Sequence, residues 1–363
     1  MQVKLLVLNF NGRQLLATYL PSVVRAADAA GVYCTVGVID NDSTDGSRQW
    51  LATNYPDVRV WHRPNRGLCS FNDVLAQIDS PVAVLLNNDI ELDSDFVRRL
   101  IQPLQRSHTD YDPRCFMTAP LCWARHGRNC EGFKTAVRWR YGLVQATGRF
   151  EGHEPGIFEP GLTASAGAAL AVDRQRFLEL GGFDPLFLPG RIEDLDFAYR
   201  GYQAGYHARY VPQAICYHQG MATFGAVFGE EGCDALALRN TLLFQWKNLR
   251  TPRHRLYQVG GIAARVATDL ARSLGGPPGQ RWKFVRALAA AWAKRRELTE
   301  GPQPARDAVR EQEFFQEFLP RRLAQAGAES VLFAARCSSR RASRHHTDDS
   351  TRVRWERALP QQV

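Results

Sequence analysis

An apolar run that ends in a polar triplet constrains this sequence more than any other stretch. Residues 82–86 (VAVLL) have the pattern of a strand that is buried on both faces of a parallel sheet, and Asn87, Asn88 and Asp89 follow directly. In open α/β sheets, ligands bind beyond the carboxyl ends of the strands. We therefore expect Asp89 to hold a divalent cation against phosphate oxygens. Taken alone, the triplet also fits a simple turn that closes a strand.

The first part of the chain alternates predicted strands with predicted helices. Apolar runs predict strands at residues 3–9, 34–39, 58–61 and 82–86, and helical spacing is clearest at residues 15–24 and about 70–79. This alternation is typical of a doubly wound, mostly parallel sheet. No G-x-G-x-x-G follows the first strand and no Walker A motif is present, so dehydrogenase-type and P-loop nucleotide sites are not supported.

Four motifs resemble glycosyltransferase family 2, and they stand in that family's order. They are residues 8–12 (LNFNG), 39–47 (IDNDSTDGS), 65–68 (NRGL) and 86–89 (LNND). The second motif is the most specific. The resemblance, closest in kind to bacterial rhamnosyltransferase-like members, implies an α/β fold of the GT-A type. We thus expect a doubly wound, mostly parallel sheet flanked by helices, with a C-terminal helical appendage.

The resemblance also implies a nucleotide site. Asp40 would read the base, and the backbone around Phe10 would cradle it. The full set of nucleotide-binding residues that the resemblance implies is Leu8, Phe10, Asp40, Asp42, Asn65, Arg66, Asn87 and Asn88. The family's D-x-D metal motif aligns with residues 87–89, where Asn87 replaces the first carboxylate. Asp89 is then the only anionic ligand of this motif.

The small residues at 163–169 lead into an apolar run, which suggests a strand that another group approaches closely. A second group of matches to the family comprises Gly167-Ala168, GGFD at 181–184, Glu193-Asp194 and AGY at 204–206. The resemblance implies that Asp194 is the general base that removes a proton from an acceptor hydroxyl. Glu193 would orient the acceptor or its loop, Gly167 would lie on the acceptor side, and Asp196 would stand behind them or on the helix face. Acidic residues in a first helical turn are otherwise commonplace, because they stabilise the helix dipole.

His218 ends an apolar run at residues 209–218. A lone histidine after a strand is usually structural or solvated. The resemblance implies that His218 joins Asp89 as a ligand of Mn²⁺ or Mg²⁺, and imidazole suits Mn²⁺ better.

Two segments allow more than one interpretation. Residues 107–160 are rich in arginine and aromatic residues, including Trp123, His126, Arg138, Trp139 and Arg140. They could line a sugar or phosphate site, or pack as a surface insertion. Residues 219–225 (QGMATFG) are expected to form a mobile loop over the donor, which would exclude water during transfer.

The C-terminal third differs in charge from the rest. Residues 250–363 carry 22 Lys and Arg against 11 Asp and Glu, whereas residues 1–249 carry 24 against 26. Helices are expected at 239–249, 254–274 and 280–297. The third has an apolar face formed by Trp282, Val285, Leu288, Ala289 and Trp292. This basic amphipathic helix could lie in a membrane interface or dock on the catalytic domain.

We thus expect a catalytic domain at 1–220, a helical appendage at 221–300 and a charged tail at 301–363 that is partly disordered, especially around residues 338–350. The eight cysteines form no C-x-x-C pair, which argues against structural zinc and fits reduced thiols in the cytoplasm. No apolar run is long enough to span a bilayer, and residues 1–8 are too short for a signal peptide. The expected location is cytoplasmic, with peripheral contact to the inner face of the cell membrane left open.

The motifs therefore predict a metal-dependent glycosyltransferase, and the family resemblance implies that it inverts the anomeric centre. It would move a hexosyl or deoxyhexosyl group from a UDP-, dTDP- or GDP-sugar to a hydroxyl of a glycan or lipid-linked acceptor, in polysaccharide or cell-envelope biosynthesis. A catalytically silent sugar-binding or scaffold protein is the main alternative, and a nucleotidyltransferase is a weaker one. No nucleic-acid partner is expected, because no recognised module accompanies the basic tail.

Overall fold

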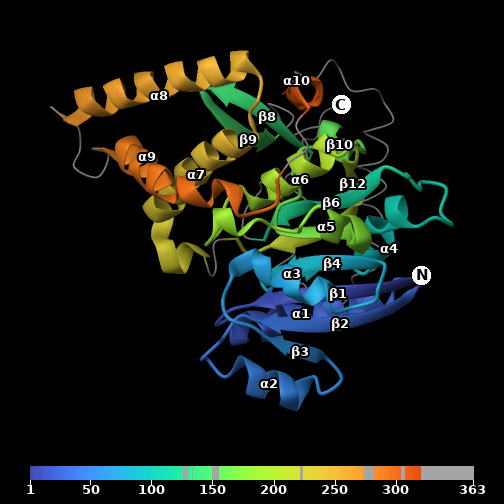
Figure 1. Cartoon of the computed structure of the whole chain (residues 1–363). Coiled ribbons are helices and arrows are strands. Elements are labelled where there is room, and N and C mark those ends of the chain that lie inside the picture. Colours follow the sequence, from blue (N-terminus) through green and yellow to red (C-terminus); the bar gives the residue numbers. More distant parts are fainter. Residues whose placement is uncertain are drawn as a thin grey trace, which may run out of the picture.

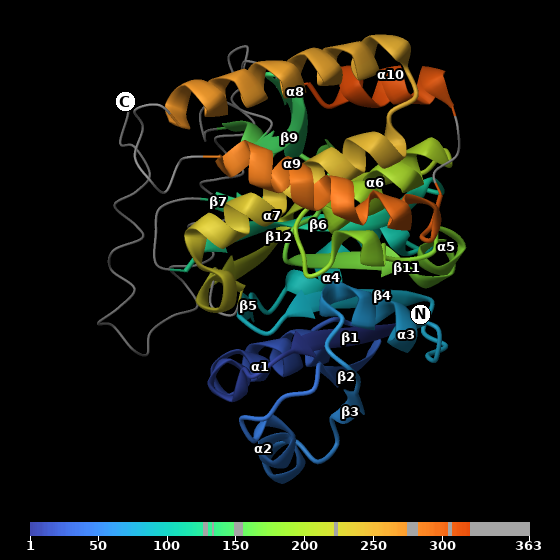
Figure 2. The same cartoon turned by 60° about the vertical axis from the view of Figure 1, so that its left-hand side comes forward.

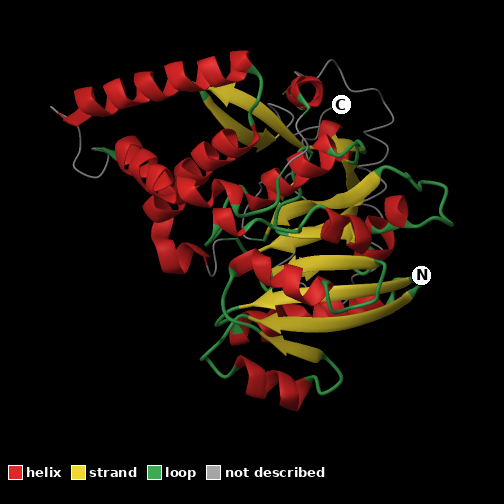
Figure 3. Cartoon of the chain, viewed as in Figure 1, coloured by secondary structure: helices red, strands yellow, loops and turns green. Residues whose placement is uncertain are grey.

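One large, curled sheet runs through the centre of the computed structural model, with helices on both faces (Figures 1 and 3). The structure describes residues 1–125, 130–132, 134–148, 155–220, 224–273, 282–303 and 307–319. Within them, the main path of the sheet has the strand order β10-β12-β6-β11-β4-β1-β2-β3. The predicted α/β fold, a sheet flanked by helices, is therefore present, but the sheet is parallel only in part and contains several antiparallel pairs.

Four parallel strands form the half of the sheet built from the first part of the chain. They are β1 (Gln2–Asn9), β2 (Tyr33–Asp40), β3 (Arg59–His62) and β4 (Val82–Asn87). In register, Asn9 is opposite Asp40, and Leu8 is opposite Asn87. The polar residues that end these strands therefore meet at one edge, away from the N label in Figure 1.

The other half of the sheet is mixed. Its strands are β5 (Ile90–Leu92), β6 (Cys115–Ala124), β7 (Cys130–Gly132), β10 (Gly161–Thr163), β11 (Ala169–Asp173) and β12 (His207–His218). β11 runs antiparallel to both β4 and β6, whereas β12 runs parallel to β6 and antiparallel to β5. The strands β8 (Thr135–Arg140) and β9 (Leu143–Gly148) pair in a separate hairpin.

Apolar side chains cover each face of the sheet. Helices α1 (Arg13–Asp28), α2 (Ser47–Asn54) and α4 (Phe96–Leu100) contribute to the core on one face. Helices α3 (Ser70–Leu75), α5 (Arg174–Glu179) and α6 (Glu193–Gln203) contribute to the core on the other. The 3₁₀ turns are η1 (Gly67–Cys69), η2 (Gln102–Leu104), η3 (Pro155–Phe158), η4 (Pro185–Phe187) and η6 (Arg295–Thr299).

The C-terminal helices pack on the β8–β9 hairpin and on α6 (Figure 2). They are α7 (Phe224–Asn248), α8 (Pro252–Ser273), α9 (Lys283–Lys294) and α10 (Ala308–Glu317). The buried Lys247 of α7 lies 2.6 Å from Asp184 and 3.0 Å from Asp196, both also buried. The packing therefore continues across residue 220, where the sequence analysis placed a domain boundary.

Helix α10 is a correction to the expected charged tail. Its Phe314 and Phe315, with Phe318 just beyond it, are buried in the same core as α6 and α7. Asp307 caps the helix by accepting bonds from the N–H groups of Val309 and Arg310. Charge dominated our interpretation of this stretch, although its aromatic spacing is typical of a buried helix face. The segment around 338–350, predicted to be disordered, lies outside the described residues.

Helix α9 is also buried on a different face from the one expected. Phe284, Ala287 and Ala291 enter the core, whereas Trp282 and Trp292 of the predicted face are exposed. The predicted loop 219–225 is shorter in the structure, because α7 begins at Phe224, and residues 221–223 lie outside the described part. No helix among the described residues has the length and apolar character that crossing a membrane demands.

Candidate active site

Hydrogen bonds between side chains join the carboxyl ends of three strands. Asn88, after β4, donates through Nδ2 to Oδ1 of Asn9 at 2.8 Å. Asn9, at the end of β1, donates in turn to Oδ1 of Asp40 at 3.3 Å. All three side chains are buried. This buried chain of hydrogen bonds holds in place the turn at Asn88 and Asp89, which directly follows the end of β4.

Gly12 permits the close approach of these groups. A Cβ atom at this position would lie 2.1 Å from Nδ2 of Asn88 and 2.6 Å from Oδ1 of Asn9. Any side chain there would overlap the carboxamides, so the glycine of the first motif serves close packing rather than turn flexibility.

The loops after β1 and β2 are bonded directly to each other. Ser43 Oγ accepts from the backbone N–H of Asn11 at 2.9 Å, and Asn11 Oδ1 accepts from that of Thr44 at 2.7 Å. Asp45 accepts from the N–H of Arg13, the first residue of α1. Burial raises the pKa of Asp45, but hydrogen bonds from Ser47 and the Arg13 N–H outweigh it and lower the pKa. The polar side chains of the second motif therefore hold these two loops together.

The predicted base-reading residue, Asp40, has no exposed surface. Its Oδ2 accepts from the N–H of Ser43 and lies 3.6 Å from Nε of Arg48. A base could contact this carboxylate only after one of these partners moved. Asp42, by contrast, is exposed and lies 3.0 Å from the ring of His62.

The other predicted nucleotide-binding residues border the same edge of the sheet. Leu8, Phe10 and Asn87 are half-buried at the ends of β1 and β4, and Asn65 and Arg66 are exposed. Oδ1 of Asn65 accepts from Asn41 Nδ2 at 3.4 Å, which ties the third motif to the second.

Asp89 and His218 meet because β5 pairs with β12. His218 is opposite Ile90 in the antiparallel register, so the residue before β5 faces the end of β12. Oδ1 of Asp89 lies 3.2 Å from Nε2 of His218 and has no hydrogen-bond donor among the described residues. The Gln219 N–H also donates to the backbone carbonyl of Asp89 at 3.0 Å.

This pair fits a divalent cation. A buried carboxylate oxygen without a donor, next to an imidazole nitrogen, is a chemically suitable pair of ligands for Mn²⁺. Within the described residues, no cluster of three or more His, Cys, Asp or Glu side chains is arranged to hold a metal. A metal held here would therefore take its remaining ligands from water and phosphate oxygens.

A second set of contacts surrounds Asp89 and His218. Glu91 forms an ion pair with Arg125, whose guanidinium lies 5.0 Å from the ring centre of Tyr19. The hydroxyl of Tyr19 donates to Gln219 at 2.7 Å. These contacts link α1, β5 and Gln219, which directly follows β12. The geometry of the Asp89–His218 pair therefore depends on segments that are far apart in the sequence.

Asp194 lies in the first turn of α6 and reaches the loop before β11. One carboxylate oxygen accepts a short hydrogen bond from the hydroxyl of Ser165 and a 3.3 Å bond from the N–H of Gly167. The neighbouring Ala168 carbonyl accepts from the N–H of Asn87 at 3.1 Å. Asp194 is thus connected through one loop to the end of β4, two residues before Asp89.

The two acidic neighbours of Asp194 differ in environment. Burial raises the pKa of Glu193 to about 8, with a further contribution from the Asp194 charge. Asp196 is fully buried and paired with Arg200 and Lys247. Burial alone would raise its pKa, but Lys247 and then Arg200 hold it below the usual range. Asp196 therefore holds α6 to α7 and has no surface for an acceptor.

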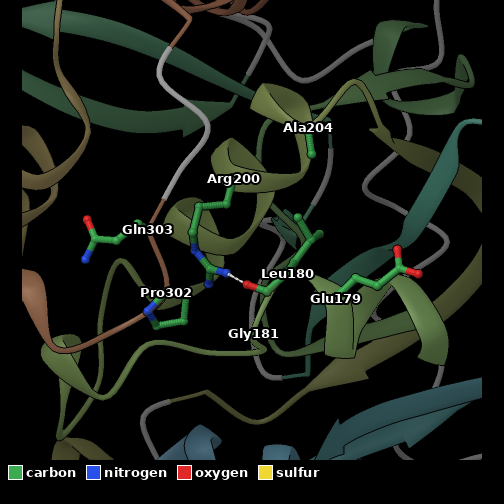
Figure 4. Close-up of a pocket in the computed structure, with 7 residues that line it drawn as sticks. All are labelled: Glu179, Leu180, Gly181, Arg200, Ala204, Pro302 and Gln303. Atoms are coloured by element: carbon green, nitrogen blue, oxygen red, sulfur yellow. Dashed lines mark hydrogen bonds between the residues drawn. The ribbon is translucent and has the colours of Figure 1, made fainter.

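Two cavities lie away from these residues. One, of about 350 Å³, is lined by Glu179, Leu180, Gly181, Arg200, Ala204, Pro302 and Gln303. Figure 4 shows Arg200 turned toward the carbonyl of Leu180 in this cavity. The other, of about 490 Å³, is an apolar groove between α7, α8 and α9. Neither contains a residue predicted for the site.

The sequence analysis missed several residues that shape the site. Ser165 bonds the predicted base, Asn9 bonds both Asn88 and Asp40, and Asn240 of α7 holds the segment before α6. Ser165 stands in the small-residue run at 163–169 that had been singled out, so its polarity was an available signal. Asn240 lies outside every motif and offered none.

The aromatic segment at 107–160 is used for packing where it is described. Trp139 lies 5.5 Å from Tyr257 and 5.3 Å from Phe315, measured between ring centres. It therefore packs against α8 and α10. His126 lies outside the described residues.

Comparisons with known proteins agree with this architecture. Residues 5–120 match the model of a family described as Glycosyl transferase family 2. No curated protein matches the chain. Two similar solved structures are GalNAc-T7 with UDP, GalNAc and Mn²⁺, and the mannosyltransferase PcManGT from Pyrobaculum calidifontis in complex with GDP-Man and Mn²⁺.

Both structures are 18% identical to this chain. The first has a TM-score of 0.50, with 68% of this chain and 48% of that chain covered, so the match spans about half of that protein. The second has a TM-score of 0.46, with coverages of 81% and 86%. The predicted family resemblance and the predicted GT-A type of α/β fold are both confirmed.

Proposed function

We propose that this chain, whose residues 5–120 match glycosyl transferase family 2, transfers a sugar from a nucleotide-diphosphate-sugar to an acceptor hydroxyl. The observation that carries the proposal is the arrangement at one sheet edge. The Asp89–His218 pair lies there, and the loop that bonds Asp194 is hydrogen-bonded to the end of β4, just before Asp89.

The residues divide the chemistry between them. Asp89 and His218 would hold Mn²⁺ or Mg²⁺, which supplies Lewis-acid stabilisation of the diphosphate leaving group. Asp194 takes the proton from the acceptor hydroxyl. At the same time, the oxygen of that hydroxyl bonds to the anomeric carbon, and the bond from this carbon to the phosphate oxygen breaks. Ser165 and the Gly167 N–H orient the carboxylate for this step. Attack from the face opposite the diphosphate inverts the anomeric centre.

The donor is proposed to be a UDP-, dTDP- or GDP-sugar with a hexosyl or deoxyhexosyl group, rhamnosyl among them. The two similar structures carry UDP or GDP-Man together with Mn²⁺, which supports this class of donor. The acceptor is proposed to be a glycan or lipid-linked hydroxyl used in polysaccharide or cell-envelope biosynthesis, with the reaction taking place in the cytoplasm.

A thermal-shift and hydrolysis panel tests the proposal. Wild-type protein is screened against UDP-, dTDP- and GDP-sugars, each with Mn²⁺, Mg²⁺ or EDTA. We expect a metal-dependent stabilisation and slow donor hydrolysis with one nucleotide class. Asp89→Ala and His218→Ala should lose both effects, whereas the exposed Asp57→Ala should keep them. Sugar binding without any turnover, unaffected by EDTA, would support a silent sugar-binding protein instead.

The C-terminal helices offer a surface suited to an anionic membrane. Leu256, Val259 and Leu270 are exposed on α8, and Trp292 is 58% exposed on α9. Trp292 also lines the apolar groove, together with Trp246, Ile262, Val285, Leu288 and Ala289. Phe284 on one face of α9 is buried in the core, whereas Trp292 on another face is exposed. One face therefore docks on the rest of the chain, and the other is available for contact with a membrane.

Charge favours lipid headgroups as the occupant of this surface. Within the described part of residues 252–300, nine Lys and Arg stand against three Asp and Glu, one of which, Asp269, is buried. Arginines among exposed apolar side chains are typical of interfacial helices. Co-sedimentation with vesicles containing phosphatidylglycerol should exceed that with neutral phosphatidylcholine vesicles. Val259→Asp combined with Leu270→Asp should abolish it, and equal binding to both vesicle types would contradict the proposal.

A further inference from the structure

The backbone before Glu193 is strained. Arg191 has a φ of 80° and Ile192 a φ of 75°, so two successive residues with side chains occupy the left-handed region. Such conformations are unfavourable for residues with side chains and persist where the surrounding structure holds them in place. Here they set the start of α6, and with it the side chains of Glu193 and Asp194.

The Glu193 carboxyl group lies in an unusual environment. Its Oε2 atom is shielded from solvent and has no hydrogen-bond partner among the described residues. The titratable or charged groups found to act on it are Asp194 and Arg191 on its own segment, and Cys69 of η1 across from it. The charge that acts most strongly on the Glu193 carboxyl group is therefore that of a second carboxylate, Asp194.

We propose that Glu193 works in its neutral, proton-bearing form, as a positioning residue. Asp194 and Asp196 are then the charged acids in the first turn of α6, and the charge of Asp196 is compensated by Arg200 and Lys247. A second buried charge beside Asp194 would repel the donor's diphosphate and would change the basicity of Asp194. The part of the proposal that concerns transfer rests on the proposed function. The protonation state itself does not.

The sign of the pH effect follows from linkage. Burial raises the pKa of Glu193 to about 8, whereas a glutamate in the unfolded chain titrates near its ordinary value of 4.5. Between these two values the unfolded chain loses the proton and the folded chain keeps it. The Glu193 proton therefore stabilises the fold fully below the unfolded pKa, and this stabilisation declines as the pH rises toward about 8.

Glu193→Gln separates protonation from shape, because glutamine resembles the neutral acid. Thermal unfolding of the wild type and of this variant is compared at half-unit steps from pH 5 to pH 9. We expect Glu193→Gln to gain melting temperature relative to the wild type as the pH rises, and the gain to level off above about pH 8. The same substitution at the exposed Glu313 of α10 is the control and should show no such trend.

Transfer assays supply the second arm. Each protein's kcat is expressed relative to its own maximum across the same pH range, with Mg²⁺ as the metal. The wild type should fall above about pH 8, and Glu193→Gln should lack this alkaline fall. Burial raises the pKa of Cys69 to about 12, so this thiol does not titrate in the window.

The two arms give distinguishable failures. A pH-independent difference in melting temperature between wild type and Glu193→Gln overturns the neutral-acid proposal, whatever the enzyme transfers. The expected melting trend without any turnover on the donor panel leaves the neutral acid in place and rejects the proposed function. An unchanged alkaline fall in Glu193→Gln, with the expected melting trend, overturns the positioning role.

Discussion

Two hydrogen-bond donors contact one carboxylate oxygen of Asp194. Ser165 and the Gly167 N–H both bond Oδ2, while Oδ1 accepts from the N–H of Leu195. These contacts fix the orientation of the carboxylate at the amino end of α6. A base that is already oriented needs little rearrangement when an acceptor arrives.

Asp194→Asn should therefore lower kcat by about 10²- to 10⁴-fold, the usual range for removing a general base. Donor binding should change little, because Asp194 is separate from the Asp89–His218 pair. Donor affinity by calorimetry, alongside kcat, checks both halves. Turnover near the wild-type level in Asp194→Asn would reject the assignment of the base.

Gly12→Ala tests the close approach beneath the metal-ligand turn. The added methyl group would displace Asn88 and break its bond to Asn9, leaving two buried carboxamides poorly paired. A lost buried hydrogen bond of this kind costs about 1–3 kcal/mol. Urea unfolding should show this loss, together with weaker metal-dependent donor binding. Gly12 has a φ of −122°, which any residue can adopt, so the loss would come from the overlap with the carboxamides rather than from backbone strain.

The segment before α6 is held mainly by α7. Nδ2 of Asn240 lies 2.7 Å from the carbonyl of Phe187, 2.8 Å from that of Gly190 and 2.9 Å from that of Arg191. Arg239 donates to the carbonyl of Leu188 at 2.6 Å. The carbonyl of the next residue, Pro189, lies close to Gly67. One carboxamide on a C-terminal helix thus fixes the path of the strained residues that lead to Asp194.

Asn240→Ala should reduce kcat more than it reduces donor affinity. The substitution frees the segment at 187–191, and a misplacement of about 1 Å at a reacting group can cost roughly 10²-fold in rate. Steady-state kinetics with varied donor separates the two effects. Asn54→Ala on the exposed end of α2 is the matched control. A purely thermal defect, with kcat unchanged at a permissive temperature, would show that Asn240 has only a structural role.

The described C-terminal helices share a hydrophobic core with α6 and the β8–β9 hairpin, so they pack against the part of the chain that precedes residue 220. Lys247 neutralises two buried carboxylates, Asp184 and Asp196, that come from the first 220 residues. Removing one partner of a buried ion pair costs about 3–5 kcal/mol. The cost is comparable to the whole stability of many domains.

A chain that ends at residue 220 should therefore fail to fold, whereas a chain that ends at residue 319 should fold and keep donor binding. The first truncation exposes the core around Tyr199 and removes Lys247, which is the ion-pair partner of Asp184 and one of the two cationic partners of Asp196. The second truncation keeps every described helix. Circular dichroism and gel filtration distinguish the two outcomes. A cooperative thermal transition in the chain of 220 residues would show that the predicted domain boundary holds.

Local pattern was enough to identify the sheet and the residues at its edge. Apolar runs followed by polar residues marked the ends of β1, β2 and β4, and parallel pairing then required those ends to meet. Motif order supplied Asp194 and His218 as candidates. Aromatic residues of α10 were misjudged, because charge was given more weight than spacing in that stretch.

The local sequence pattern did not predict the contacts between segments that are far apart in the chain. The pairing of β5 with β12 brings His218 to Asp89, and the burial of Asp40 depends on Asn9 and Arg48. Asn240 reaches a segment some 50 residues earlier in the chain. A one-dimensional pattern encodes periodicity and chemical type, so it specifies strands, helices and reactive groups. The partners and the burial of side chains depend on how separate elements pack in three dimensions. This packing set the pairing of Asp89 with His218 and the environment of Glu193.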